Sequence, residues 1–360
     1  MESRKIIPII IPTLEPDERF LNILSELASK NIGPIIVVDD GSGERYGHFF
    51  KAAEDNYHAY VLAHEVNLGK GRALKNAFRY CLEKWPDMVG CITADSDGQH
   101  TPQSILKCRK ALLDNPMSLV LGVRNFLMDR EGRIPAKSMF GNRLTCRVLQ
   151  GLYGIHISDT QTGLRGIPTD FMRYLLHIKG DRFEFETQML IEAKVNEISL
   201  VEVPVETIYD SKENHSTHFK PILDSVRIYR LFGAEFGKFV LSSLSSAIVD
   251  MILFGLFCRL LRRDYAVSGG YIIFATVSAR LVSAVFNYCV NYFVVFKSRR
   301  GHMKSALRYV ILAVVQMLCS AVFTMVLFRL LPVRTELAVK IPVDVLLFLF
   351  SYMIQRRSVY

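Results

Sequence analysis

Residues 88–100 read Met88-Val89-Gly90-Cys91-Ile92-Thr93-Ala94-Asp95-Ser96-Asp97-Gly98-Gln99-His100. The apolar first half predicts a buried strand, and two carboxylates one residue apart follow its end. Oxygen ligands suit hard divalent cations, and Mg²⁺ or Mn²⁺ commonly keeps coordination positions open for a substrate's phosphates. We therefore predict a compact metal site formed by Asp95, Asp97 and Gln99.

Short apolar runs alternate with helical patterns on both sides of this stretch. Residues 5–11 and 35–38 are continuously apolar and β-branched, which is typical of strands buried on both faces. Between them, residues 17–29 have apolar side chains at helical spacing. The alternation continues with residues 57–63, residues 70–83, residues 88–92, a helix after Pro102, and residues 118–123. Such alternation predicts a parallel α/β sheet that binds its ligand at the carboxyl ends of the strands.

A second acidic site follows the strand at residues 35–38, in the stretch Val37-Val38-Asp39-Asp40-Gly41-Ser42-Gly43. A carboxylate here can accept hydrogen bonds from a ribose hydroxyl or a base N–H, and the glycines allow close approach of the backbone. An ordinary polar turn after a strand gives the same pattern. The presence of two acidic strand ends in one sheet favours the binding site.

Residues 67–74 form a glycine-flanked basic turn that opens a helix, Asn67-Leu68-Gly69-Lys70-Gly71-Arg72-Ala73-Leu74. Free N–H groups at a helix start, together with the cations Lys70 and Arg72, suit a diphosphate. The turn lacks the spacing of a P-loop. A capped helix with a solvated lysine is the alternative interpretation.

Two later segments add phosphate and sugar contacts to the prediction. Several cations follow the strand at residues 118–123, and we select Arg124 and Arg143 because arginine forks match phosphate oxygens. Residues 158–166 are rich in donors and acceptors and suit a sugar or an acceptor phosphate. Residues 181–186 open a further helix, and their acids are also explained by the favourable placement of negative charge at a helix N-terminus.

The C-terminal third has the composition of a membrane domain. Residues 238–360 contain 15 Lys and Arg against 4 Asp and Glu, whereas residues 1–237 contain 29 against 31. A basic surplus confined to the apolar part favours contact with anionic lipid and excludes a nucleic-acid-binding function, which needs a basic face on the soluble part. Four apolar stretches predict four transmembrane helices, at residues 239–261, 271–296, 309–331 and 337–354.

The basic residues also predict an orientation. Residues 297–308 form the most basic connector, and Arg356 and Arg357 close the chain. By the positive-inside tendency we expect both to lie in the cytoplasm together with the N-terminal domain, and the chain to cross the plasma membrane several times. The N-terminus shows no cleavable signal peptide, and the seven cysteines show no paired C-x-x-C spacing, so we expect them to be reduced.

Polar residues within the predicted spans have two interpretations. They are Asp250, Arg280, Asn287, Asn291, Gln316, Lys340 and Asp344. They line a groove for a lipid headgroup, or the charged members pair with one another and hold the helices together. Residues 219–236 are amphipathic, which fits a helix at the membrane interface and equally a helix that packs on the soluble domain.

Taken in order, these segments resemble the family-2 glycosyltransferases, specifically the polyprenyl-phosphate branch that includes dolichol-phosphate mannose synthases. The matching segments are residues 11–13, 37–42, 67–73, 95–100, 122–124, 159–166, 182–186 and 203–209. The resemblance implies a GT-A fold (nucleotide-diphospho-sugar transferase, Rossmann-like) for residues 1–217. It further implies a juxtamembrane helix at 218–237 and an all-α, GtrA-like domain of four transmembrane helices at 238–360.

The resemblance also implies roles for single residues. It implies that Pro12 and Asp39 touch the nucleotide, that Asp95, Asp97 and Gln99 bind Mg²⁺ or Mn²⁺, and that Arg124 and Arg143 meet phosphate. From their place in the motifs, we further expect these residues to bind the nucleotide-sugar: Glu15, Asp40, Lys70, Arg72, Asp95, Gln161 and Arg165. Asp97 and Asp159 are the expected catalytic residues, and Asp159 organises the acceptor. Members of the family usually read P-T-Y-N-E in the first loop. This chain reads Pro12-Thr13-Leu14-Glu15-Pro16, and whether Glu15 or Asp17 replaces the missing acid stays open.

The expected reaction is an inverting, metal-dependent transfer of a sugar from a nucleotide-sugar to polyprenyl (undecaprenyl) phosphate for cell-surface glycosylation. UDP-glucose and UDP-N-acetylglucosamine are the favoured donors, with GDP-mannose behind them, and the membrane domain is a candidate homo-oligomer contact. A processive polysaccharide synthase is a rival, but the Q-x-x-R-W motif is missing and the one tryptophan is Trp85. A flippase or transporter with a nucleotide-sugar-sensing domain is another.

Overall fold

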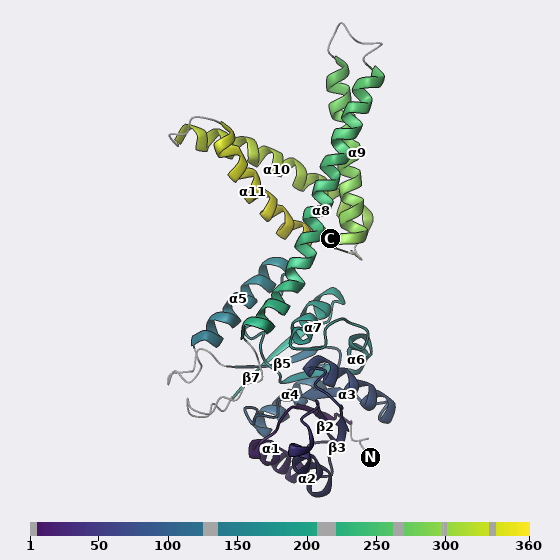
Figure 1. Cartoon of the computed structure of the whole chain (residues 1–360), viewed down its shortest axis with the longest axis vertical. Coiled ribbons are helices and arrows are strands. Elements are labelled where there is room, and N and C mark those ends of the chain that lie inside the picture. The colour runs from purple at the N-terminus through teal and green to yellow at the C-terminus, as the bar shows by residue number, and fades with distance from the viewer. Residues whose placement is uncertain are drawn as a thin grey trace. The chain divides into compact units, whose positions relative to one another are not determined.

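The computed structural model describes residues 6–124, 136–206, 221–261, 270–296, 298, 301–330 and 336–360. Contacts divide the chain into two compact units, Met1–Ile228 and Tyr229–Tyr360 (Figure 1). The expected juxtamembrane segment, 218–237, includes three residues outside the described ones and the first part of helix α8. Its place at a membrane surface stays a prediction.

The first unit alternates strands and helices along the chain, as the sequence predicts. Its strands are β1 Ile9–Thr13, β2 Ile35–Asp39, β3 Tyr60–Ala63, β4 Gly90–Thr93, β5 Leu119–Arg124, β6 Arg165–Pro168 and β7 Leu200–Val205. Its helices are α1 Glu18–Ser29, α2 Gly47–Tyr57, α3 Lys70–Lys84, α4 Pro102–Asp114, α5 Ala136–Tyr153, α6 Thr169–Leu175 and α7 Glu184–Val195.

The strands form one mixed sheet in the order β3-β2-β1-β4-β6-β5-β7. The first four are parallel, and β5 is parallel to β7, but β6 runs antiparallel between β4 and β5. The prediction of a wholly parallel sheet is therefore wrong at β6. This strand is only four residues long and follows a polar segment, so it lacks the apolar run that identifies the others.

Alternate residues of each strand face opposite layers of helices. Ile9 and Ile11 belong to an apolar cluster that includes Phe20 of α1 and Ile105 of α4, whereas Ile10 is buried outside it. Helix contacts sort in the same way, because α1 contacts α2 and α4, while α3 contacts α6 and α7. The continuous apolar runs thus have the expected cause, which is burial on both faces.

Several predicted boundaries shift in the structure. The strand predicted at 5–11 lies at Ile9–Thr13, and the one predicted at 88–92 lies at Gly90–Thr93. The run predicted at 57–63 is divided, because Tyr57 ends α2 and β3 begins only at Tyr60. His58 lies between them in the left-handed conformation, φ 52°, which ends the helix.

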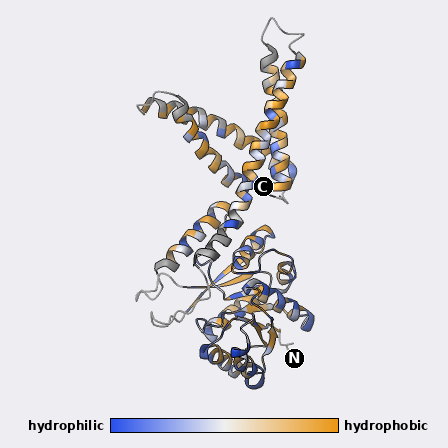
Figure 2. Cartoon of the chain, viewed as in Figure 1, coloured by the Kyte–Doolittle hydropathy of each residue, from blue (hydrophilic) through white to orange (hydrophobic). Residues whose placement is uncertain are grey.

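The second unit consists of long helices. They are α8 Pro221–Leu261 from Tyr229 onward, α9 Gly270–Val290 with a π-helical turn Asn291–Val295, α10 His302–Leu330, and α11 Glu336–Ile354 with a closing turn Gln355–Val359. Figure 2 shows that their residues are mostly apolar. Among the described residues, Gly233–Leu260 and His302–Ser320 are long and apolar enough to cross a membrane. Large apolar side chains are exposed on the helices of this unit, such as Met251 on α8 and Leu281 on α9, and this exposure suits a lipid environment.

Polar side chains within the second unit form contacts with one another. Asp250 lies 3.6 Å from Arg280 and accepts a hydrogen bond from Ser283 Oγ. Asn291 donates from Nδ2 to Gln355 Oε1, at 3.2 Å. Asp250 and Arg280 therefore pair with each other, as the second of the two interpretations predicts. The side chain of Lys340 lies outside the described ones.

Candidate active site

The acids predicted to form the site lie at one edge of the sheet. Strand β1 pairs in parallel with both β2 and β4, and Thr13 at its end is in register with Asp39 at the end of β2. Asp95 follows the end of β4. Because carboxyl ends of parallel strands share an edge, Asp39 and Asp95 both open onto it. Arg124, the last residue of β5, and the residues just before β6 lie at the same edge, because β6 runs antiparallel to both β4 and β5.

The carboxylate of Asp95 contacts Lys70 and His100, and Gly163 leaves the space that it occupies. Lys70 Nζ lies 2.7 Å from Asp95 Oδ1, and His100 Nε2 lies 3.4 Å from Oδ2. A Cβ added to Gly163 would meet both carboxylate oxygens, so only glycine leaves room for the acid in this position. Burial favours a raised pKa for Asp95, but the positive charge of Lys70 and the hydrogen bond from His100 hold it well below its usual range.

Lys70 has a second acidic partner, which we did not predict from the sequence. Its Nζ lies 2.9 Å from Oε1 of Glu186, a buried residue in the first turn of α7. Burial alone would lower the pKa of Lys70, but Asp95 and Glu186 raise it above its ordinary value. The acids of residues 181–186 are also explained by the helix dipole, so the sequence does not single out Glu186, although its segment matches the family. The lysine is therefore part of the site and not a solvated residue.

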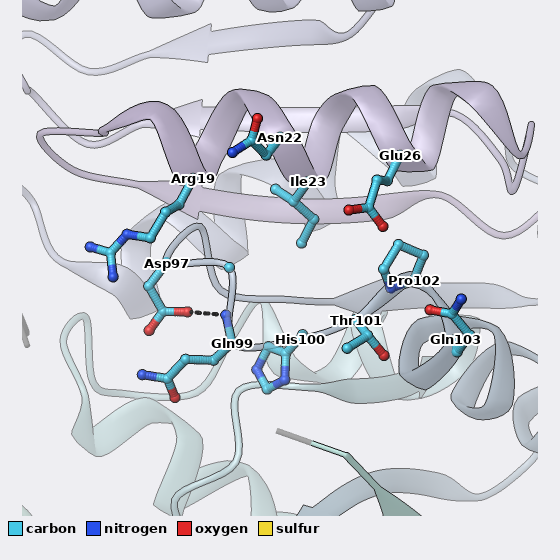
Figure 3. A pocket seen from close by; sticks show the side chains of 11 residues that line it. Arg19, Asn22, Ile23, Glu26, Asp97, Gln99, His100, Thr101, Pro102 and Gln103 are labelled. Atoms are coloured by element: carbon cyan, nitrogen blue, oxygen red, sulfur yellow. Dashed lines mark hydrogen bonds between the residues drawn. The ribbon is translucent and has the colours of Figure 1, made fainter. Parts of the chain in front are cut away.

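Asp97 faces a cavity of about 280 Å³ between α1 and the loop that leads into α4 (Figure 3). Its Oδ1 accepts a hydrogen bond from the backbone N–H of Gln99 at 3.0 Å. Burial, and then the negative charge of Asp95, raise the pKa of Asp97. Asp39 and Asp95 do not line the cavity, so it is at most one side of a nucleotide-sugar site.

The donor set fits a divalent ion of the kind that also binds phosphates. Mg²⁺ is commonly held by one or two carboxylates together with substrate oxygens, and Asp95 and Asp97 are two such carboxylates whose charges repel each other. In the described part of the chain, no three His, Cys, Asp or Glu side chains gather as a ready metal centre. Any ion at Asp95 and Asp97 would thus need further ligands, such as the Gln99 amide and the diphosphate. Metal binding stays a prediction.

The two neighbouring acids after β2 point to different partners. Asp39 is half-buried, and its Oδ1 accepts a hydrogen bond from Ser42 N at 2.8 Å. Asp40 is buried, with Oδ1 bound to His64 Nδ1 and Leu68 N and Oδ2 bound to Gly69 N, all within 2.9 Å. Asp40 therefore shapes the turn before Lys70, and Asp39 is the one that opens onto the site.

The first loop presents its acid in an unusual backbone conformation. Glu15 is exposed, has φ 47°, and donates its N–H to Ser42 Oγ at 2.8 Å. Asp17 instead caps α1 and pairs with Arg19 at 2.6 Å. Of the two candidates for the missing family acid, Glu15 is thus the one next to the Asp39 turn. Pro12 is buried in β1, beside Val38 of β2.

Two ion pairs, which we call the clamp, join the start of α3 to Asp181, just before α7. Arg72 Nη2 lies 2.8 Å from Asp181 Oδ2, and Lys75 Nζ lies 3.1 Å from Oδ1 of the same residue. A Cβ on Gly71 would lie 2.6 Å from Cβ of Phe185, so the glycine allows the two helices to approach. The clamp brings Lys70 and Glu186 within reach of each other. Arg72 makes this contact in the structure, and its role as a phosphate ligand stays a prediction.

Arg124 and Asp159 form a buried ion pair at the end of β5. Arg124 Nε lies 2.7 Å from Asp159 Oδ2, and Nη2 lies 2.8 Å from Oδ1. Asp159 is 0% exposed, and its Oδ1 also accepts a hydrogen bond from Gln161 N. Both oxygens of Asp159 are therefore engaged. Asp159, which is predicted to be catalytic, thus orients the side chain of Arg124 and the backbone of the exposed Gln161 beside it.

Arg124→Ala is expected to destabilise the protein by about 3–5 kcal/mol, because it leaves the buried Asp159 charge without its partner. Urea unfolding of the purified protein, compared with Asp159→Ala and the double variant, measures this effect. The double variant should be more stable than the sum of the single effects predicts. Additive effects would show that the pair contributes nothing through contact.

Arg165 lies inside the protein, whereas Arg143 lies on its surface. Arg165 is 1% exposed, and its Nη1 donates to the backbone oxygen of Glu186 at 2.6 Å, so it supports Glu186 from within the protein. Arg143 is exposed on α5. The preceding residue, Asn142, donates from Nδ2 to the backbone oxygen of Ser158 and accepts at Oδ1 from Thr160 Oγ1. The structure thus brings Asp39, Lys70, Asp95, Asp97, Arg124 and Gln161 to the edge, and leaves Arg165 beneath it.

Comparison with known proteins agrees with this geometry. Residues 9–175 match the family described as glycosyl transferase family 2, and residues 233–360 match the GtrA/DPMS transmembrane domain. The chain joins a family 2 glycosyltransferase domain to a GtrA/DPMS membrane domain. The resemblance and the fold class inferred from the sequence are confirmed, and the protein is a membrane protein.

Relatives of the glycosyltransferase domain include enzymes named for lipid phosphates. The UDP-N-acetylglucosamine–dolichyl-phosphate N-acetylglucosaminyltransferase of Methanococcus voltae is 28% identical over 65% of this chain and 98% of its own length. The dolichyl-phosphate β-glucosyltransferase of Trichomonas vaginalis is 28% identical over 65% of this chain and 69% of its own. Mannosyl-3-phosphoglycerate synthase from Rubrobacter xylanophilus, a solved structure, is 15% identical over 73% of this chain and 76% of its own, with a TM-score of 0.41.

Proposed function

We propose that the protein transfers a sugar from a nucleotide-sugar to a polyprenyl phosphate. One observation carries the proposal. Asp95, Asp97, Lys70 and Asp39 open onto one edge of a family 2 glycosyltransferase sheet, in a chain that also has a membrane domain. The names of the two relatives, which act on dolichyl phosphate, support the acceptor class.

The donor side of the proposed site contains charged groups that suit a nucleoside diphosphate. In the proposed complex, Asp39 accepts hydrogen bonds from the nucleoside, while Asp95, Asp97 and Gln99 would hold a divalent ion. When bound, the ion would stabilise the negative charge of the leaving diphosphate. Lys70 at the start of α3 adds a cation, and Asp40 holds the turn before it through the N–H groups of Leu68 and Gly69.

The acceptor needs little help from a base. A phosphate monoester has a second pKa near ~6, so it is largely a dianion at pH 7 and its oxygen is already a nucleophile. Asp159, with both oxygens engaged, is not suited to remove a proton. We propose instead that it orients Arg124, whose guanidinium binds an acceptor phosphate oxygen. Attack on the anomeric carbon from the face opposite the diphosphate inverts its configuration.

The donor is identified by incubating membranes that contain the protein with labelled UDP-glucose, UDP-N-acetylglucosamine or GDP-mannose, each with and without added undecaprenyl or dolichyl phosphate. We expect one donor to label the organic-extractable lipid, and only when the polyprenyl phosphate is present. Label in a water-soluble polymer would favour the processive synthase. Movement of a preformed lipid-linked sugar across liposomes, without incorporation, would favour the flippase.

Chelation of divalent ions is expected to reduce incorporation by about 10²-fold or more, because the ion contributes several kcal/mol of stabilisation to the departing charge. Initial rates in EDTA, and after Mn²⁺ or Mg²⁺ is returned in excess, measure the effect. Incorporation that is equal with and without EDTA, after the protein has been dialysed against the chelator, would contradict the role assigned to Asp95 and Asp97.

A further inference from the structure

Lys70 contacts one of the two carboxylate oxygens through which Asp95 could bind a metal ion. Its ammonium lies 2.7 Å from Asp95 Oδ1, which is a short, charge-assisted hydrogen bond. The side chain of Lys70 is 16% exposed and that of Asp95 is 30% exposed, so water screens their attraction only weakly. A divalent ion that approaches Asp95 in the ligand-free protein must therefore compete with this lysine.

The same lysine has a second acid that keeps it in place when it leaves the first. Glu186 Oε1 lies 2.9 Å from Lys70 Nζ, and the side chain of Glu186 is 11% exposed. Arg165 holds the backbone oxygen of Glu186, and the Arg72–Asp181 pair joins the two helix starts. Lys70 can thus release Asp95 without becoming an unpaired buried charge, which would be unfavourable.

The lysine is also placed where a diphosphate would attract it. Lys70 is the first residue of α3, directly after Gly69 with φ 101°, so its ammonium extends from a helix N-terminus, where negative charge is favoured. The four-carbon stem of a lysine is flexible and its ammonium has three rotatable donors. A short movement away from Asp95 would allow the ammonium to bind phosphate oxygens while it keeps Glu186.

We propose that Lys70 is a placeholder cation: it neutralises Asp95 in the ligand-free protein, and transfers to the diphosphate when a divalent ion replaces it on Asp95. The inference rests on the proposed function. It makes binding of the metal and of the nucleotide cooperative, because the nucleotide removes the competitor of the metal. By linkage, each ligand then raises the affinity for the other by the same factor.

The test measures Mn²⁺ binding to the full-length protein in nanodiscs, by the loss of the electron paramagnetic resonance signal of free Mn²⁺, with and without saturating UDP. The wild-type protein should bind Mn²⁺ more tightly when UDP is present. Lys70→Met should bind Mn²⁺ about tenfold or more tightly than wild type without UDP, because no charge-assisted hydrogen bond has to be displaced. With saturating UDP, the two proteins should agree within about twofold.

Two further variants sharpen the measurement. Lys110→Met removes an exposed lysine of α4 and should match wild type in both conditions. Glu186→Gln removes the negative charge of the second acid that pairs with Lys70. The lysine then depends more strongly on Asp95, so Mn²⁺ binding without UDP should become weaker than in wild type. It also provides a second test if Lys70→Met does not fold, and Mn²⁺ binding to Glu186→Gln that equals or exceeds the wild-type value would overturn the proposal.

The outcomes separate the inference from the function. If Lys70→Met tightens Mn²⁺ binding by the same factor with and without UDP, only the general charge of the lysine matters and the placeholder role is refuted. Unchanged Mn²⁺ binding in Lys70→Met refutes it as well, while the proposed function stands. If UDP does not tighten Mn²⁺ binding to wild type, the metal–diphosphate site itself is wrong, and both proposals fail.

Discussion

Asp97→Asn is expected to reduce sugar transfer by about 10²-fold or more while the protein stays folded and membrane-bound. The asparagine keeps an Oδ1 that can accept the hydrogen bond from Gln99 N, so the loop conformation is retained. What is lost is one of two negative charges that hold the divalent ion, and with it several kcal/mol of stabilisation of the leaving diphosphate. The initial rate of label incorporation into lipid measures the loss.

Asp114→Asn is the matched control, since it makes the same change at an exposed position at the end of α4. Its rate should equal that of wild type. Gel filtration and thermal unfolding of both variants report whether the fold is retained. Undiminished turnover of Asp97→Asn, with divalent ions chelated, would refute the metal role of this acid.

Gly163→Ala is expected to reduce transfer by about 10–10²-fold through Asp95 alone. The added methyl group would meet both carboxylate oxygens of Asp95, with Oδ1 at 2.6 Å, so the acid must move away from Lys70 and His100. A displacement of about 1 Å of a group that positions a reactant can reduce rate by about 10²-fold. The same rate assay, together with the Mn²⁺ affinity of the variant, measures the effect.

Gly151→Ala makes the identical change where a Cβ meets nothing within 4 Å. In the last turn of α5 this substitution should leave the rate unchanged and raise the free energy of unfolding by about 0.4–1 kcal/mol. Should Gly163→Ala match Gly151→Ala in rate, the close contact between Gly163 and Asp95 has no part in transfer.

The sequence predicts the part of the site that depends on local pattern. Asp39 and Asp95 are predicted because each follows a short apolar run, and parallel strands place such ends at one edge. The same reasoning fails at β6, since four residues with a polar approach carry no periodic signal. It also fails to separate Asp39 from Asp40, because which of two adjacent acids turns inward depends on the distant partners His64, Leu68 and Gly69.

The remaining features depend on contacts between segments far apart in the chain. Glu186 reaches Lys70 only because the helix starts of α3 and α7 meet, and Asp159 reaches Arg124 only because β6 returns between β4 and β5. No spacing within either segment indicates these pairs. The resemblance to the family identified both segments, but it could not show that Asp159 would be fully buried against Arg124.

The measurement that tests the central claim most directly is the stoichiometry of the purified protein's reaction in nanodiscs that contain polyprenyl phosphate. Nucleoside diphosphate release and the mass of the extracted lipid are followed together. The account predicts one glycosyl unit added to the lipid phosphate for each nucleoside diphosphate released, and neither product when the polyprenyl phosphate is left out. Nucleoside diphosphate released without a lipid-linked sugar would contradict it.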